Sequence, residues 1–131
     1  MSSASAYSRE WYQAQYGRLT FSAQVSAAGT TENILAVRNA SYRIFVQSVQ
    51  VTPTTDAAET ITFQDDAGTP VPVAVYDGAA APVNLIPYLA DFGPEGVPLT
   101  TGFNLDMVVG AGGALRARVH VEGYQKLVLT I

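Results

Sequence analysis

The feature that most restricts the fold of this chain is a strict alternation of apolar and polar side chains in its short apolar stretches. Residues 115–123 show it best, with apolar side chains at every second position: Leu115, Ala117, Val119 and Val121. The polar side chains between them are Arg116, Arg118, His120 and Glu122. Because successive side chains of a strand point to opposite faces, this pattern predicts a β-strand with one face in a core and one in solvent.

Similar stretches recur along the chain, separated by turn-forming residues. In residues 18–26 the alternating apolar side chains are Leu19, Phe21, Ala23 and Val25. Turn signals follow one another roughly every 8 to 12 residues, which is typical of a β-sandwich or a β-barrel. We therefore predict an all-β fold, an antiparallel β-sandwich of about eight strands.

Two local irregularities refine this prediction. In residues 42–52 the apolar positions change from even to odd numbers at Gln47 and Ser48, and a β-bulge is the simplest cause. Pro70 and Pro72 have no N–H to donate to a neighbouring strand, so the strand that contains them should lie at a sheet edge. The sequence Asp-Asp-Ala-Gly at residues 65–68 suits the turn of a hairpin before that strand.

Composition limits the kinds of partner that the chain can bind. With 131 residues and no cysteine, it is long enough to bury a core as one domain without disulfides. Only 14% of its residues are charged, against about 25% in typical soluble proteins. The neutral surface either faces solvent through small polar side chains or lies against partners. A net charge of −4 with scattered basic residues argues against a nucleic-acid partner.

Residues 1–17 differ in composition from the rest, so we separate them as an N-terminal arm from a sandwich domain at residues 18–131. The arm carries four large aromatic side chains: Tyr7, Trp11, Tyr12 and Tyr16. It forms either a short helix or an extended arm, and on a helix these side chains would pair on shared faces. They either bind a groove on a partner or cover an open end of their own domain. Because Trp and Tyr dominate interface energetics, these four are our predicted partner-binding residues.

The sequence offers little that could support catalysis or bind a metal. It contains one histidine and no cysteine, and His120 lies on the polar face of a predicted strand. A hydrolytic triad and a zinc site therefore lack their usual components. The acidic residues in predicted turns lack the spacing of a calcium loop. We expect no enzymatic activity, no cofactor and no metal.

The first residues carry no sign of export or membrane insertion. They lack the basic start and the apolar segment of a secretory signal. No stretch of the chain approaches the ~20 apolar residues of a membrane helix. We expect synthesis in the host cytoplasm and no membrane partner.

A series of short segments carries a resemblance to a known group of proteins. Residues 60–68 read TITFQDDAG, residues 85–87 read LIP, residues 91–93 read DFG and residues 99–105 read LTTGFNL. In the order and composition of their predicted strands and turns, residues 32–124 resemble small jelly-roll structural proteins of tailed bacteriophages, including capsid decoration proteins and head spikes or fibres. The resemblance implies a sandwich of jelly-roll type, commonly a homotrimer, that binds the major capsid protein on the outside of the shell.

These expectations lead to two hypotheses of function. The first is a virion structural protein on the capsid exterior, which decorates a phage-like capsid and stabilises it through non-covalent contacts. The alternative is a carbohydrate- or host-surface-binding module of a phage spike, fibre or baseplate. In that module the aromatic side chains of Tyr76, Tyr88 and Phe92, which we expect to be exposed near loop tips, would stack on sugars.

Overall fold

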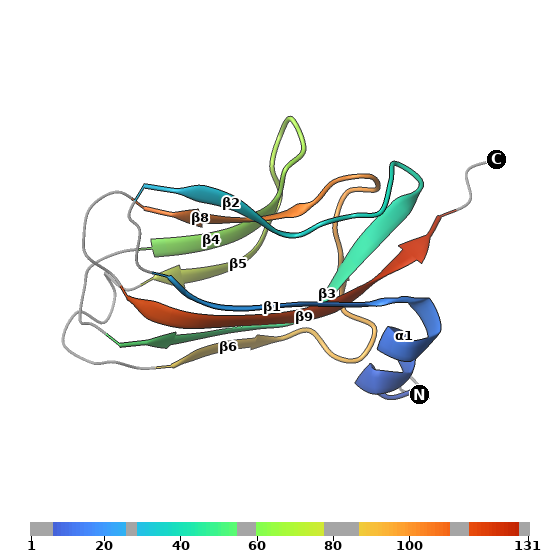
Figure 1. The fold of residues 1–131 in the computed structure, drawn as a ribbon, viewed down its shortest axis with the longest axis horizontal. Helices are drawn as coiled ribbons and strands as arrows, with labels where there is room; N and C mark the ends of the chain where they lie inside the picture. Colours follow the sequence, from blue (N-terminus) through green and yellow to red (C-terminus); the bar gives the residue numbers. More distant parts are fainter. Residues whose placement is uncertain (1–6, 26–28, 55–59, 78–86, 111–115, 129–131) are drawn as a thin grey trace, which may run out of the picture.

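The computed structural model describes residues 7–25, 29–54, 60–77, 87–110 and 116–128, which form a short helix and two sheets packed face to face (Figure 1). The helix is α1 (Arg9–Tyr16). The strands are β1 (Arg18–Val25), β2 (Thr31–Leu35), β3 (Tyr42–Pro53), β4 (Thr60–Asp65), β5 (Pro72–Asp77), β6 (Tyr88–Asp91), β7 (Val97–Pro98), β8 (Leu105–Val109) and β9 (Ala117–Leu127).

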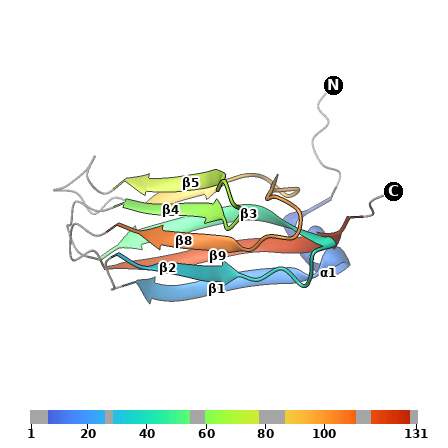
Figure 2. The ribbon, with the colours of Figure 1, turned by 90° about the horizontal axis from the view of Figure 1, so that it is seen from above.

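The two sheets are antiparallel throughout. The first has the order β1-β9-β3-β6, with β7 also paired to β3, and the second has the order β2-β8-β4-β5. Figure 2 looks onto the second sheet and shows its four strands in this order. The predicted antiparallel β-sandwich is confirmed. The described residues contain nine strands rather than about eight. The additional one is the two-residue β7, which lies within residues 90–98, where the sequence predicts an irregular loop.

Some expected strand positions are only partly covered by the described residues. The sequence predicts a strand at residues 83–89, and β6 begins at Tyr88, while residues 83–86 lie outside the described part. The sequence also predicts a strand at residues 127–131. In the structure β9 runs as far as Leu127, and residues 129–131 lie outside the described part.

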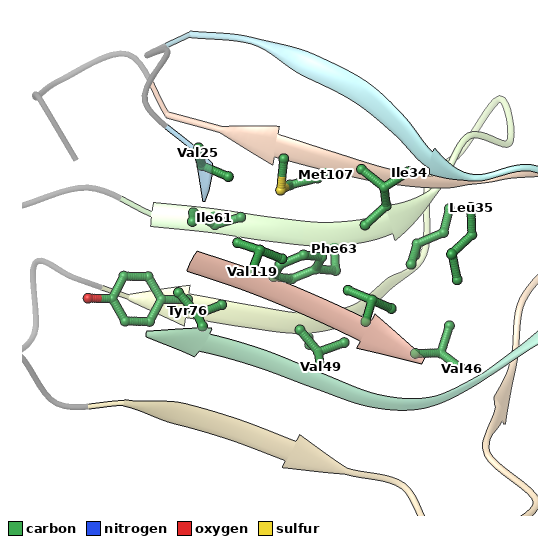
Figure 3. Close-up of a cluster of buried hydrophobic side chains, with 14 of the residues drawn as sticks. Val25, Ile34, Leu35, Val46, Val49, Ile61, Phe63, Tyr76, Met107 and Val119 are labelled. Carbon is green, nitrogen blue, oxygen red and sulfur yellow. The ribbon is translucent and has the colours of Figure 1, made fainter. Parts of the chain in front are cut away.

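The core lies between the sheets and follows the alternation in the sequence. Phe63 and Ile61 of the second sheet meet Val119 and Val49 of the first (Figure 3). All four side chains are fully or almost fully buried, and each such burial stabilises the fold by about 1.5–3 kcal/mol. The alternation is weaker in β1, where Ala23 is exposed although it lies on the core-facing side. This exposure follows from the place of β1 at the edge of its sheet.

The predicted bulge in β3 is confirmed. Val46 pairs with Gly123 of β9 and Ser48 pairs with Glu122, which leaves Gln47 without a partner in that ladder. The extra residue changes the side of the sheet to which the following side chains point. As a result Gln47 is buried on the outer face of the first sheet rather than in the core.

The turn after β4 also forms as predicted and leads into β5, which lies at the edge of the second sheet. Asp65 is fully buried there and accepts hydrogen bonds from the hydroxyl and N–H of Thr100 and from the N–H of Val71. Burial alone would raise the pKa of Asp65, but these hydrogen bonds together lower it. The ionised carboxylate of Asp65 thus connects the end of β4 with the segments that carry Val71 and Thr100.

Candidate functional site

The N-terminal segment forms a helix, which is one of the two conformations that the sequence left open. The hydroxyl of Ser8 caps α1 by accepting a hydrogen bond from the N–H of Trp11 at 3.1 Å. Gly17 ends the helix with φ of 122° and donates its N–H to the carbonyl of Gln13 at 3.0 Å. A helix of eight residues is marginal by itself, so it depends on packing against the sandwich.

Polar contacts hold α1 on the outer face of the first sheet. Gln13 is almost wholly buried, and its Nε2 donates to Gln47 Oε1 at 2.9 Å and to Glu122 Oε1 at 3.0 Å. The Gln13 hydrogen bond, followed by one from His120, lowers the pKa of Glu122. Arg9 forms an ion pair with Asp91 at 2.8 Å. Figure 1 shows α1 at the end of the sandwich where β9 turns outward.

The Gln47 side chain in the bulge completes this contact. Its Nε2 donates to the backbone carbonyl oxygens of Arg9 and Pro94, at 3.2 and 2.6 Å. Both ends of the buried amide are therefore hydrogen-bonded, as a buried polar group requires. The bulge predicted from sequence thus serves to join the helix and the loop after β6 to the sheet.

A stack of aromatic rings continues the contact between helix and sheet. The rings of Tyr12 and Tyr16 lie 5.5 and 5.7 Å from that of Tyr124 in β9. The Tyr124 ring in turn stacks on Phe45 at 5.0 Å, with an angle of 4° between their planes. Burial, helped by Tyr12 and Glu95, raises the pKa of the Tyr124 hydroxyl. Two of the four predicted residues therefore cover an end of their own domain.

The other two predicted residues form the outer layer of the same cluster. The ring of Tyr7 stacks on that of Trp11 at 4.0 Å, and Trp11 meets Tyr12 and Tyr16 edge to face at 5.0 and 6.0 Å. Tyr7 remains 50% exposed. The structure thus brings all four predicted residues together. Their contact with a partner stays a prediction.

A hollow of about 430 Å³ opens between this cluster and the end of the first sheet. We call it the aromatic groove and define it by its lining: Tyr7, Trp11, Tyr12, Tyr16, Phe45, Glu95, Gly96, Pro98, Tyr124 and Lys126. Lys126 contributes the single cation, with Nζ 4.9 Å from the centre of the Tyr16 ring. Glu95 contributes the single carboxylate and accepts a hydrogen bond from the Tyr12 hydroxyl at 3.2 Å. Such a surface can bind apolar or aromatic groups and one charged group at each side.

Sequence reasoning missed the half of the aromatic groove that the sandwich provides. Phe45 and Tyr124 are far from the arm in sequence, and only the fold brings them under it. One local signal was present, because Tyr124 continues the outward positions of β9 after His120 and Glu122. A large aromatic ring at such a polar-face position indicates that something covers it.

Gly96 shapes the rim of the groove. Its φ is 77°, a conformation that favours glycine. A Cβ added at this position would lie 2.7 Å from the carbonyl oxygen of Val46. The close approach of this loop to β3 therefore requires glycine.

The aromatic residues of the alternative hypothesis are placed differently. We expected Tyr76 to be exposed, and this is wrong: it is 9% exposed and packs edge to face with Tyr88, 6.2 Å between ring centres. The strand that carries it pairs with β4 so that Tyr76 faces the core, as Figure 3 shows. Phe92 is partly buried and also packs against the core.

His120 takes the outward position that the alternation in residues 115–123 predicts. His120 lies on the outer face of β9 with Nε2 2.9 Å from Glu122 Oε2. Within the described ranges, no three His, Cys, Asp or Glu side chains gather as metal ligands would. The part of the chain that the structure describes contains no helix with the length and apolar character needed to cross a membrane.

No protein-family model matches the chain, and no curated protein matches it either.

Proposed function

We propose that the chain is a non-enzymatic virion structural protein of jelly-roll type that decorates the outside of a phage-like capsid. It would bind the major capsid protein and further copies of itself, as the homotrimer that the resemblance implies. The aromatic groove would form the main contact with the shell. Repetition over the symmetric capsid would multiply a modest affinity per copy.

The pairing of the strands supports the jelly roll. β1 pairs with β9, β2 with β8, β3 with β6 and β4 with β5. These pairs are nested around the turn between β4 and β5, as in one long hairpin. Successive pairs lie alternately in the first and the second sheet, an alternation that supports a double-sheet jelly roll.

The surface supports a protein that lies against neighbours. Large apolar side chains remain exposed on both sheets and their loops: Val71, Val75, Leu89, Phe103 and Leu127. With only 14% charged residues in the chain, such areas can be buried against a partner at a low cost of desolvation. The net charge of −4 disfavours a direct contact with the packaged nucleic acid.

The observation that carries the proposal is the aromatic groove itself. It gathers six aromatic rings, from Tyr7, α1, β3 and β9, and the outermost ring, Tyr7, is half exposed. Tyr and Trp are the residues that most often dominate binding energy at interfaces, because they combine a large apolar area with few rotatable bonds. A glycan would also need free polar groups, whereas the hydroxyls of Tyr12 and Tyr124 are both bonded to Glu95.

Co-sedimentation with the phage-like capsid encoded in the same genome tests this proposal. We expect Tyr7→Ala to weaken binding about tenfold, the effect of losing an interface side chain worth about 1.4 kcal/mol. Asn33→Ala serves as the control, because Asn33 is exposed, lies in the second sheet, and belongs neither to the groove nor to the exposed apolar side chains. Binding of Tyr7→Ala at the wild-type level would contradict the role of the groove. Binding of the isolated protein to glycans but to no capsid would favour the host-surface module.

A further inference from the structure

In the described part of the chain, the first sheet ends with β1 on one side and with β6 and the two-residue β7 on the other, and the second ends with β2 and β5. The outer side of an edge strand presents backbone N–H and C=O groups that can pair with another chain. Proteins guard such edges with short strands, charges, prolines or bulges, and an edge without these devices is a site for strand pairing. The four edges of this sandwich differ in this respect.

Three of the edges are guarded. β5 begins with Pro72 and ends with the charged Asp77. β6 has four residues and ends with Asp91. β2 has five residues, contains Glu32, and its register against β8 shifts between Asn33 and Leu35.

β1 carries none of these devices. It has eight residues and pairs with β9 along its whole length without a register shift. Its only charge is Arg18 at the first position, and residues 19–25 contain neither a charge nor a proline. Among the described residues, none pairs with its other side. Figure 2 shows β1 along the rim of the sandwich, next to β2 of the other sheet.

A small hollow lies beside this edge. It measures about 140 Å³, and its lining includes Phe21, Ala23, Val25, Glu32 and Met107. Ala23 faces the core side of β1 and is still exposed. Because the Ala23 side chain is small, it leaves apolar surface exposed in this hollow. A strand paired with β1 would place one of its side chains there.

We propose that β1 joins two copies of this chain, paired antiparallel around a two-fold axis at Ser22. This register places Thr20 opposite the partner's Gln24, so polar side chains meet on one face. It places Phe21 opposite the partner's Ala23, so the largest side chain of the strand fills the hollow beside the smallest. Both contacts occur twice because the interface is symmetric.

The self-complementary register favours a second copy as the occupant of this edge, because it pairs the large Phe21 with the small Ala23 and Thr20 with Gln24, and charge does not oppose it. Arg18 lies outside the seven residues that pair, so the two cations do not face one another across the axis. Like charges directly opposite would destabilise a strand pair, and this register contains none. The contact does not involve the aromatic groove and goes beyond the proposed function. It joins copies in pairs, so it builds a dimer, or a hexamer where a three-fold contact also forms.

Light scattering on the purified full chain over a range of concentrations tests this inference. The expected mass is an even number of copies, and Ser22→Lys should halve it by placing two cations on the axis. Gln50→Lys is the matched control. Ser22 of β1 and Gln50 of β3 both pair with His120 of β9, one from each side, and both side chains are exposed. Gln50, however, lies in a central strand and not at an edge.

Each other outcome has a definite meaning. A monomer, or an odd number of copies in the wild type, would overturn the pairing through β1. An unchanged mass of Ser22→Lys would also overturn it. The same holds if Ser22→Lys and Gln50→Lys lower the mass equally, because a lysine anywhere on this face of the sheet would then have the same effect. A wild-type trimer that binds capsids would overturn this inference and leave the proposed function intact.

Discussion

Asp106 lies on the outer face of β8 with a side chain that is only 9% exposed. Its Oδ1 is buried, and no group in the described residues donates a hydrogen bond to it. Burial raises the pKa of Asp106, and the carboxylates of Asp66 and Asp65 raise it further. The fold therefore favours the protonated acid, and the ionised form lowers stability at neutral pH.

We expect Asp106→Asn to raise the free energy of unfolding at pH 7 by about 1 kcal/mol, because it removes a buried, unsatisfied charge. The folded-state pKa lies above the unfolded one, so the penalty is absent below the unfolded value of 3.8 and grows as the pH rises. Wild type and variant should therefore differ at pH 7 and converge in acid. Urea unfolding at both pH values checks this, with the exposed Glu32→Gln as control. A variant less stable than wild type at pH 7 would refute it.

At the scale of elements, α1 owes its place to a few buried polar groups. The side chain of Gln13 connects Gln47 in the β3 bulge with Glu122 in β9. The aromatic rings of Tyr12 and Tyr16 then pack against Tyr124 beside these hydrogen bonds. The helix thus packs directly on the sandwich, and its removal would uncover the rings of Phe45 and Tyr124.

Gln13→Ala should lower the free energy of unfolding by about 1–3 kcal/mol, because it leaves the buried Gln47 Oε1 without its donor. Gln15→Ala, on the exposed side of the same helix, should change it by less than about 0.5 kcal/mol. Thermal unfolding of the two variants compares them directly. Equal effects would mean that the Gln13 contact does not hold the helix.

Local sequence patterns were enough to predict most of the elements. Alternation located the core-facing side of β9, the change of phase located the bulge at Gln47, and proline located the edge strand β5. These features depend on neighbours along one strand. The aromatic groove depends instead on the approach of Tyr16 to Tyr124, which only the pairing of β1 with β9 produces. Burial of Tyr76 was missed because two phases of alternation were possible in β5.

We propose that the molecule as a whole uses two separate surfaces. The aromatic groove lies at one end of the first sheet and would face the capsid. The edge of β1 would face another copy, so that capsid binding and self-association do not compete. The low proportion of charged residues, 14%, suits a protein that is covered by neighbours in the finished particle.

The most direct test of the groove as the capsid contact uses Trp11, the single tryptophan of the chain. Replacing it biosynthetically with 5-hydroxytryptophan allows its emission to be excited apart from that of the capsid proteins. Acrylamide quenching of this emission is then measured with and without capsids. We predict that capsid binding strongly reduces quenching, and that Tyr7→Ala needs more capsid to reach the same protection. Full binding to the shell with unchanged quenching would show that another face makes the contact and would contradict the account.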